Sequence, residues 1–271
     1  MPPRFTPPTN NIYSKPSFGA SDTLLHVISR ETLQNMHPVY VEAFEKARSM
    51  TRGKRIDMRS FTNYADLDKD MASVNNKIRE YSGRSQIEGN MEAMVQAEIL
   101  EALIYDMVKS HGWFGANVSG ILPSAFDDLF LGNDLILEQK HGDGWNSYSG
   151  VGIDVTLGEV SFTKKITDTK ERLSKGGLSW IKYFESPAGN FKGSLYDIPH
   201  FVIGVDRESL FQLTSMWCDG DMIGMSKHPS RKSLLKMMIL ECDEFSRDMN
   251  EVIVKAYQRE KIFLENILSG I

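Results

Sequence analysis

The sequence has little cysteine: Cys218 and Cys242 are its only two, and no Cys-x-x-Cys pair is present. This excludes a disulfide scaffold and a cysteine-based zinc site, and it favours a reducing, cytoplasmic compartment. Long apolar runs are also missing, because no stretch approaches the roughly 18 apolar residues of a membrane span. The N-terminal segment has no apolar run after its basic residues, so we expect no signal peptide.

An excess of positive charge is missing as well. Lys and Arg number 31 against 36 Asp and Glu, which gives a net charge of −5. This excludes a histone-like binder held by bulk charge, so nucleic-acid binding would need a local basic patch. A hydrophobic fraction of 41% and a charged fraction of 25% are ordinary for a folded protein.

Four segments follow from composition and periodicity. Residues 1–22 hold five of the ten prolines and predict a disordered Pro-rich arm, either a passive tail or a partner-binding segment. Residues 23–89 predict a helical region with a break at Arg52-Gly53-Lys54, and residues 90–225 predict an α/β core. Residues 226–271 predict a C-terminal helical extension.

Within the core, the periodicity predicts alternating helices and strands. Helices are expected over 90–110 and 163–175 and from Glu208, and strands at LGNDLILE, VGIDVTLG, LSWIKYF and PHFVIGVD. The Gly-rich HGDGWNSYSG predicts a hairpin loop between the first two strands. The implied class is α/β.

The C-terminal segment repeats apolar residues in steps of three and four. The pattern spans three heptads: Leu235, Met238, Cys242, Phe245, Met249, Val252 and Ala256. A long helix packed on its own domain is one interpretation, and a homodimer seam is the other.

Three acidic residues stand among apolar neighbours. Asp134 opens one predicted strand, Asp154 lies in the middle of the next, and Glu98 lies within the apolar stripe of the 90–110 helix. A buried carboxylate is costly without a partner, so a cation shared by Asp134 and Asp154 is an attractive explanation. Glu98 is expected either to reach solvent at the edge of the stripe or to meet a metal or a lysine. Carboxylate oxygens on adjacent strands suit Mg²⁺, or Mn²⁺ in its place.

The order of these residues resembles the PD-(D/E)XK nuclease superfamily, over residues 90–206. The resemblance implies a restriction-endonuclease-like core, which is a central mixed sheet flanked by helices. It also implies Asp134 and Asp154 as metal ligands and Glu98 as an accessory acid. The lysine expected two residues after Asp154 is replaced by Thr156. Some members of the superfamily carry this lysine on the following helix, where Lys165 is the preferred candidate.

Several other residues remain alternatives. Lys164 and Lys182 are further candidates for the missing lysine. Glu138, four residues after Asp134, is expected either as a third metal ligand or as an exposed residue at the strand end. Asp127 and Asp128 either shape a turn or assist the metal site.

The expected function is therefore a Mg²⁺-dependent nuclease that hydrolyses phosphodiester bonds, in DNA rather than RNA. Basic residues on two stretches would contact the strand's phosphates: Arg52, Lys54, Arg55, Lys164 and Lys170. The alternatives are a catalytically inactive nuclease-like module that binds nucleic acid or a protein, and a helical interaction protein.

Overall fold

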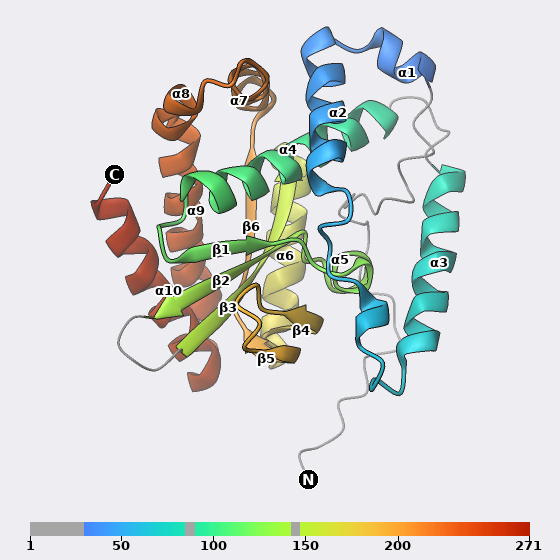
Figure 1. Ribbon diagram of the computed structural model, residues 1–271. Coiled ribbons are helices and arrows are strands. Elements are labelled where there is room, and N and C mark those ends of the chain that lie inside the picture. Colours follow the sequence, from blue (N-terminus) through green and yellow to red (C-terminus); the bar gives the residue numbers. More distant parts are fainter. Residues whose placement is uncertain (1–29, 85–89, 142–146) are drawn as a thin grey trace.

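A four-stranded mixed sheet with helices packed on both sides forms the centre of the molecule (Figure 1). The computed structural model describes residues 30–84, 90–141 and 147–271. The predicted Pro-rich arm and the tip of the predicted hairpin loop, residues 142–146, lie outside the described residues. The α/β class, the mixed sheet and the helical C-terminus are confirmed.

The N-terminal region is helical, as expected. It contains α1 (Arg30–Asn35), α2 (Pro38–Thr51), the 3-10 helix η2 (Met58–Ser60) and α3 (Leu67–Arg84). Helix α2 ends at the predicted break, where Gly53 takes a φ of 65° that favours glycine. The mid-chain helix is α4 (Asn90–His111).

The sheet has the strand order β1-β2-β3-β6. Its strands are β1 (Val118–Ile121), β2 (Leu135–His141), β3 (Ser147–Leu157) and β6 (His200–Val205). Strand β2 is antiparallel to both of its neighbours, β1 and β3, whereas β6 runs parallel to β3. Strands β2, β3 and β6 match predicted strands, while the short β1 was not expected.

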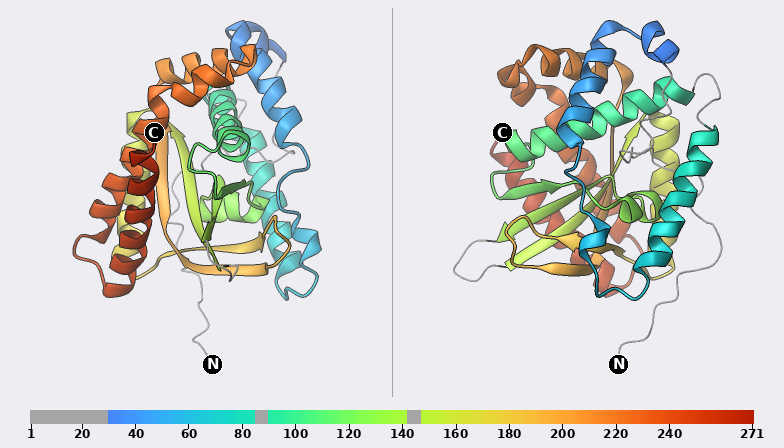
Figure 2. Two further views of the ribbon diagram at one scale, coloured as in Figure 1. Left: turned by 60° about the vertical axis from the view of Figure 1, so that its left-hand side comes forward. Right: turned by 45° about the vertical axis from the view of Figure 1, so that its right-hand side comes forward.

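The two faces of the sheet are covered by different helices. Gly120 of β1 lies against Val108 and Tyr105 of α4, so α4 covers the face that includes Leu137 and Val151. Asp154 points to the opposite face, where α6 (Glu159–Ser174) lies (Figures 1 and 2).

Three predictions for the core need correction. The strand predicted at LSWIKYF forms as β4 (Ser179–Glu185), but it pairs with β5 (Lys192–Ile198) in a separate two-stranded sheet. Strand β5 was not predicted, because its exposed positions break the apolar alternation. Residues before β2 form a helix, α5 (Ala125–Leu131), capped by Ser124 and by Gly132 at φ 67°.

The C-terminal part is a series of helices rather than one long helix. It contains α7 (Arg207–Asp219), α8 (Met222–Lys227), α9 (Pro229–Ser246) and α10 (Glu251–Ser269). The chain turns between α9 and α10, where Asp248 has a φ of 59°. The predicted heptads therefore do not continue through one helix.

Most of the residues predicted as a possible dimer seam on α9 pack inside the chain's own core. Leu235, Met238, Cys242 and Phe245 are all buried in the chain's own core, whereas Val252 is 63% exposed. The packing of the α9 stripe supports the interpretation of a helix on its own domain. The stripe itself is not free to form a dimer seam.

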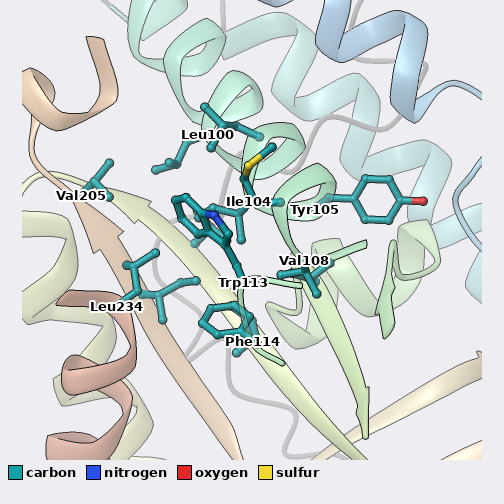
Figure 3. Packing of buried hydrophobic residues seen from close by; sticks show 14 of the residues in the cluster. Leu100, Ile104, Tyr105, Val108, Trp113, Phe114, Val205 and Leu234 are labelled. Atoms are coloured by element: carbon teal, nitrogen blue, oxygen red, sulfur yellow. The ribbon is translucent and has the colours of Figure 1, made fainter. Parts of the chain in front are cut away.

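The main core lies between α4, the sheet and α9. Trp113 is fully buried there and packs among Leu100, Ile104 and Val108 of α4 and Leu234 of α9 (Figure 3). This tryptophan serves packing, as large aromatic residues of a core commonly do. Among the helices in the described ranges, none is long and apolar enough to cross a membrane.

Candidate functional site

Asp134 and Asp154 meet at one end of the sheet. Leu135 of β2 pairs with Ile153 of β3 in antiparallel register. The next two residues, Asp134 and Asp154, therefore lie opposite one another. The backbone N–H of Asp134 donates to the Ile153 carbonyl at 2.8 Å. Asp134 Oδ2 accepts a hydrogen bond from the Val155 N–H at 2.7 Å, and the Asp134 carboxylate is close enough to hydrogen-bond a protonated Asp154.

Lys165 of α6 is the lysine that reaches these acids. Its Nζ contacts the Asp154 carboxylate and donates to the Val155 carbonyl at 2.9 Å. The pair is largely enclosed, with side-chain exposures of 17% for Lys165 and 11% for Asp154. The other candidates lie elsewhere: Lys164 pairs with Asp168 at 2.8 Å, and Lys182 pairs with Asp70 at 2.5 Å.

The site contains more acids than the sequence predicted. Buried carboxylates from α4, α5 and the two strands interact electrostatically, and we name them the acidic cluster: Glu98, Glu101, Asp128, Asp134 and Asp154. Glu101 was not considered in the sequence analysis. The sequence feature that could have identified Glu101 is its position one turn after Glu98, because residues three apart share a helix face.

Asp127 and Asp128 are adjacent in α5 but have different partners. Asp127 accepts hydrogen bonds from the backbone N–H groups of Lys182 and Tyr183, at 2.6 and 3.1 Å, so it anchors β4. Asp128 lies in the acidic cluster instead. The two roles considered for these residues were shaping the chain and assisting the metal site. Asp127 therefore has the first of these roles.

Arg55 was expected on a nucleic-acid-binding surface, but the structure places it in the acidic cluster. Its Nη1 lies 2.8 Å from Asp128 Oδ2, and its side chain is only 15% exposed. The connection after α2 is held there by the Ile56 N–H, which donates to the Leu122 carbonyl at 3.3 Å. Arg52 and Lys54, its neighbours along the chain, are exposed.

The electrostatics reflect crowding of like charge. Burial raises the pKa of Asp128 to about 7 and raises the pKa values of Glu101 and Asp154 well above their ordinary values. Burial alone would lower the pKa values of Lys165 and Arg55, but the surrounding carboxylates outweigh it and raise them. Both basic residues therefore stay charged.

The donor set suits a hard cation only in part. Within the described ranges, no three His, Cys, Asp or Glu side chains are arranged to hold one ion. However, Oδ1 of Asp134 and Oδ1 of Asp128 are buried and accept no hydrogen bond from the described residues. Mg²⁺ is commonly bound by one or two carboxylates with water completing the shell, so Asp134 and Asp154 fit this ion.

Glu138 does not belong to this site. The register places it opposite Ser119 and Gly150, four residues along β2 from Asp134. Four strand residues span about 13 Å, so the two carboxylates cannot share an ion. The expected role of Glu138 as a metal ligand is therefore corrected, and because Glu138 is only 5% exposed, the alternative of surface exposure is wrong too.

The remaining predicted phosphate-binding residues are dispersed. Lys164 and Lys170 of α6 are partly exposed and engaged in ion pairs, Lys164 with Asp168 and Lys170 with Glu244 of α9. No continuous basic surface follows from these residues.

Comparisons of the chain with models of protein families, with curated proteins and with solved structures found no match. The interpretation of the site therefore rests on its own geometry and chemistry.

Proposed function

We propose that the chain is a metal-dependent nuclease that hydrolyses phosphodiester bonds, most readily in DNA, and that its sheet and helices form a restriction-endonuclease-like core. One observation carries the proposal. Lys165, which lies on the helix after β3, contacts Asp154 and the Val155 carbonyl, while Asp134 binds the N–H of the same Val155. Two acids and a lysine from separate parts of the chain thus converge around one residue of β3.

The excess of carboxylates supports the same proposal. Among the described residues, Arg55 pairs with Asp128 and Lys165 pairs with Asp154, whereas Asp134 and Glu101 form no ion pair there within 4.0 Å. Burying uncompensated carboxylates costs several kcal/mol each, so the arrangement is poor as a purely structural device. It is suited to a site that receives a divalent cation.

In this mechanism, Asp134 and Asp154 would hold Mg²⁺ or Mn²⁺. When bound, such an ion lowers the pKa of an attacking water and stabilises charge on the phosphate. Lys165 supplies a fixed positive charge where negative charge develops on the phosphate oxygens. Arg55 opposes the effect of burial on the pKa of Asp128, and Glu98 and Glu101, when ionised, add negative charge that favours cation binding.

The test is a cleavage assay of the full chain on single- and double-stranded DNA and RNA, with Mg²⁺ or Mn²⁺ and with EDTA. Asp154→Asn should remove activity, and Lys165→Met should lower it by about 10²–10³-fold, as loss of a group that stabilises charge typically does. Lys255→Met is the matched control, because Lys255 is 71% exposed and pairs with the exposed Glu251 on α10. Intact substrates in every metal would contradict the proposal.

A second candidate is a catalytically inactive module that binds nucleic acid or a protein. Thr156 favours it, because the usual lysine position holds a neutral, buried side chain. Binding of DNA without cleavage, insensitive to Lys165→Met, would support this candidate over the nuclease.

A further inference from the structure

A second group of polar side chains lies beside the acidic cluster, on the face of the sheet that α6 covers. It consists of Asn133, His200 and Arg172, and we name it the polar pocket. Asn133 is fully buried and His200 is 3% exposed. A β-carbon on Gly152 would collide with Asn133 Oδ1 and would lie 3.1 Å from His200 Cδ2, so both side chains pack on the same point of β3.

Arg172 is placed over this point by the geometry of α6. The helix follows β3 after the single residue Gly158 and returns across the sheet. Arg172 lies seven residues, about 10 Å, beyond Lys165. Gly152 lies about 7 Å back along β3 from Asp154, the partner of Lys165. The charge of Arg172 accordingly acts on His200 and contributes to lowering its pKa.

The polar atoms of this group lack partners. Nε and Nη2 of Arg172 are buried and donate to no acceptor in the described part of the chain. These two atoms are the adjacent donors that bind two oxygens of an oxyanion side by side. Both side-chain atoms of Asn133 are buried without a hydrogen-bond partner there as well.

Arg172 forms no ion pair within 4.0 Å among the described residues. Glu241, a buried carboxylate on α9, accepts the Val202 N–H through Oε2 at 2.9 Å, and its Oε1 has no hydrogen-bond partner in the described part of the chain. The side chain of Arg172 is partly exposed, but donor atoms buried without an acceptor are costly, which favours a ligand that accepts from Nε and Nη2.

The protonation state of His200 indicates which kind of oxyanion would bind here. Its Nε2 lies 3.1 Å from the Gly132 carbonyl, which can only accept, so Nε2 carries the proton. Burial, together with Arg172, lowers the His200 pKa to about 3, so the ring is neutral and Nδ1 is an acceptor. Nδ1 is also buried without a partner in the described residues. An acceptor at this position favours an oxyanion that still carries a proton.

We propose that Arg172, Asn133 and His200 form a binding site for a small protonated oxyanion of the phosphate class. The guanidinium and the Asn133 amide donate to the oxygens, and the P–OH group donates to His200 Nδ1. Sulfate, which carries no proton near neutral pH, lacks that last hydrogen bond. The site uses none of the proposed nuclease residues and does not depend on the proposed function.

The experiment is thermal unfolding of the full chain with inorganic phosphate, sulfate or chloride at matched ionic strength, without metal or nucleic acid. Phosphate at 100 times its dissociation constant should raise the melting temperature by about 5 °C. Sulfate should bind at least 10-fold more weakly. Equal melting temperatures in phosphate and chloride would overturn the proposal.

Substitutions test whether Arg172 and His200 cause the phosphate-induced rise in melting temperature. Arg172→Met should abolish the phosphate shift, and Arg172→Lys should weaken binding at least 10-fold because it keeps the charge but loses the paired donors. His200→Phe should remove the preference for phosphate over sulfate. Arg79→Met, at an exposed position of α3, is the control and should keep the full shift.

A crystal structure of the wild type grown in phosphate checks the position independently of variant folding. Tetrahedral density within 3.2 Å of Arg172 Nε and Nη2 is expected. Water alone at these atoms would overturn the proposal.

Discussion

The molecule contains two kinds of buried carboxylate, and they differ in their partners. Glu241 of α9 accepts the Val202 N–H at 2.9 Å, and Glu260 of α10 accepts from Gln139 Nε2 at 2.7 Å. Each of them completes a hydrogen bond of the fold, although burial and the nearby Asp154 carboxylate also raise the pKa of Glu241. In the acidic cluster, by contrast, several carboxylates crowd around Arg55 and Lys165.

The difference separates structural acids from candidate functional ones. A single buried carboxylate with a good donor is a tolerable way to satisfy a backbone or amide N–H. Crowding of buried carboxylates lowers the stability of the free protein, and such a cost is typical of sites that bind a ligand. Mutations in the two groups should therefore change stability in different ways.

The largest effect is expected at Arg55. Arg55→Met should lower the free energy of unfolding by about 3–5 kcal/mol at pH 8, because Asp128 would remain buried and unpaired. The control is Arg59→Met, whose partner Asp57 is 52% exposed, and it should cost less than about 1 kcal/mol. Urea-induced unfolding measures both, and similar losses would show that Arg55 is not the cluster's counter-charge.

A divalent cation should stabilise the protein in a pH-dependent manner. The raised pKa values of Asp128, Glu101 and Asp154 mean that the folded state binds more protons than the unfolded state. The contribution of these groups to stability therefore falls as the pH rises from about 4, through the folded pKa of about 7 for Asp128. Above pH 7 the cluster is most negative and binds a cation best.

Mn²⁺ at 100 times its dissociation constant should add about 2.7 kcal/mol at pH 8. At pH 5.5 the same concentration should add much less, because protons compete for the carboxylates. Thermal unfolding with Mn²⁺ or EDTA measures this difference, and Asp134→Asn should remove it. Equal stabilisation at both pH values would argue against binding in the acidic cluster.

Substitution of the structural acids should change stability through lost packing and hydrogen bonds rather than through lost charge. Glu241→Leu should cost about 1–3 kcal/mol, because the Val202 N–H at the edge of β6 would lose its acceptor. Glu241→Gln keeps an acceptor and should cost much less. Neither variant should change the response to Mn²⁺, and a loss of that response in Glu241→Gln would place Glu241 functionally with the cluster.

The sequence was informative where periodicity is local. Helix α4 and strand β3 follow directly from their apolar spacing, whereas the expectation that Lys165 lies near Asp134 and Asp154 came from the resemblance to a nuclease superfamily. The prediction of one continuous C-terminal helix was wrong, because the apolar spacing of three and four continues by chance across residues 247–250, where the chain turns. Strand β5 was missed because its exposed positions leave no alternation.

The site was harder to predict in full because it depends on tertiary packing. Arg55 stands in a run of basic residues, and no local pattern tells one inward-pointing arginine from its exposed neighbours. Glu101 looks like an ordinary helix residue until α5 and β2 bring Asp128 and Asp134 beside it. The polar pocket likewise depends on the long-range parallel pairing that brings His200 beside Gly152.

The smallest and most selective test compares Glu101 with Glu260. Glu101→Gln keeps the side-chain shape and removes one of the crowded charges, so it should raise stability by about 1 kcal/mol at pH 8 and have little effect at pH 5.5. Glu260→Gln should lower stability at both pH values, because the charge-assisted hydrogen bond from Gln139 is weakened. Urea-induced unfolding of the two variants at both pH values measures the contrast. If Glu101→Gln were destabilising at pH 8, Glu101 would be a structural acid like Glu260. A gain in stability together with weaker Mn²⁺ binding would indicate that the charge of Glu101 is retained for cation binding at the expense of the fold.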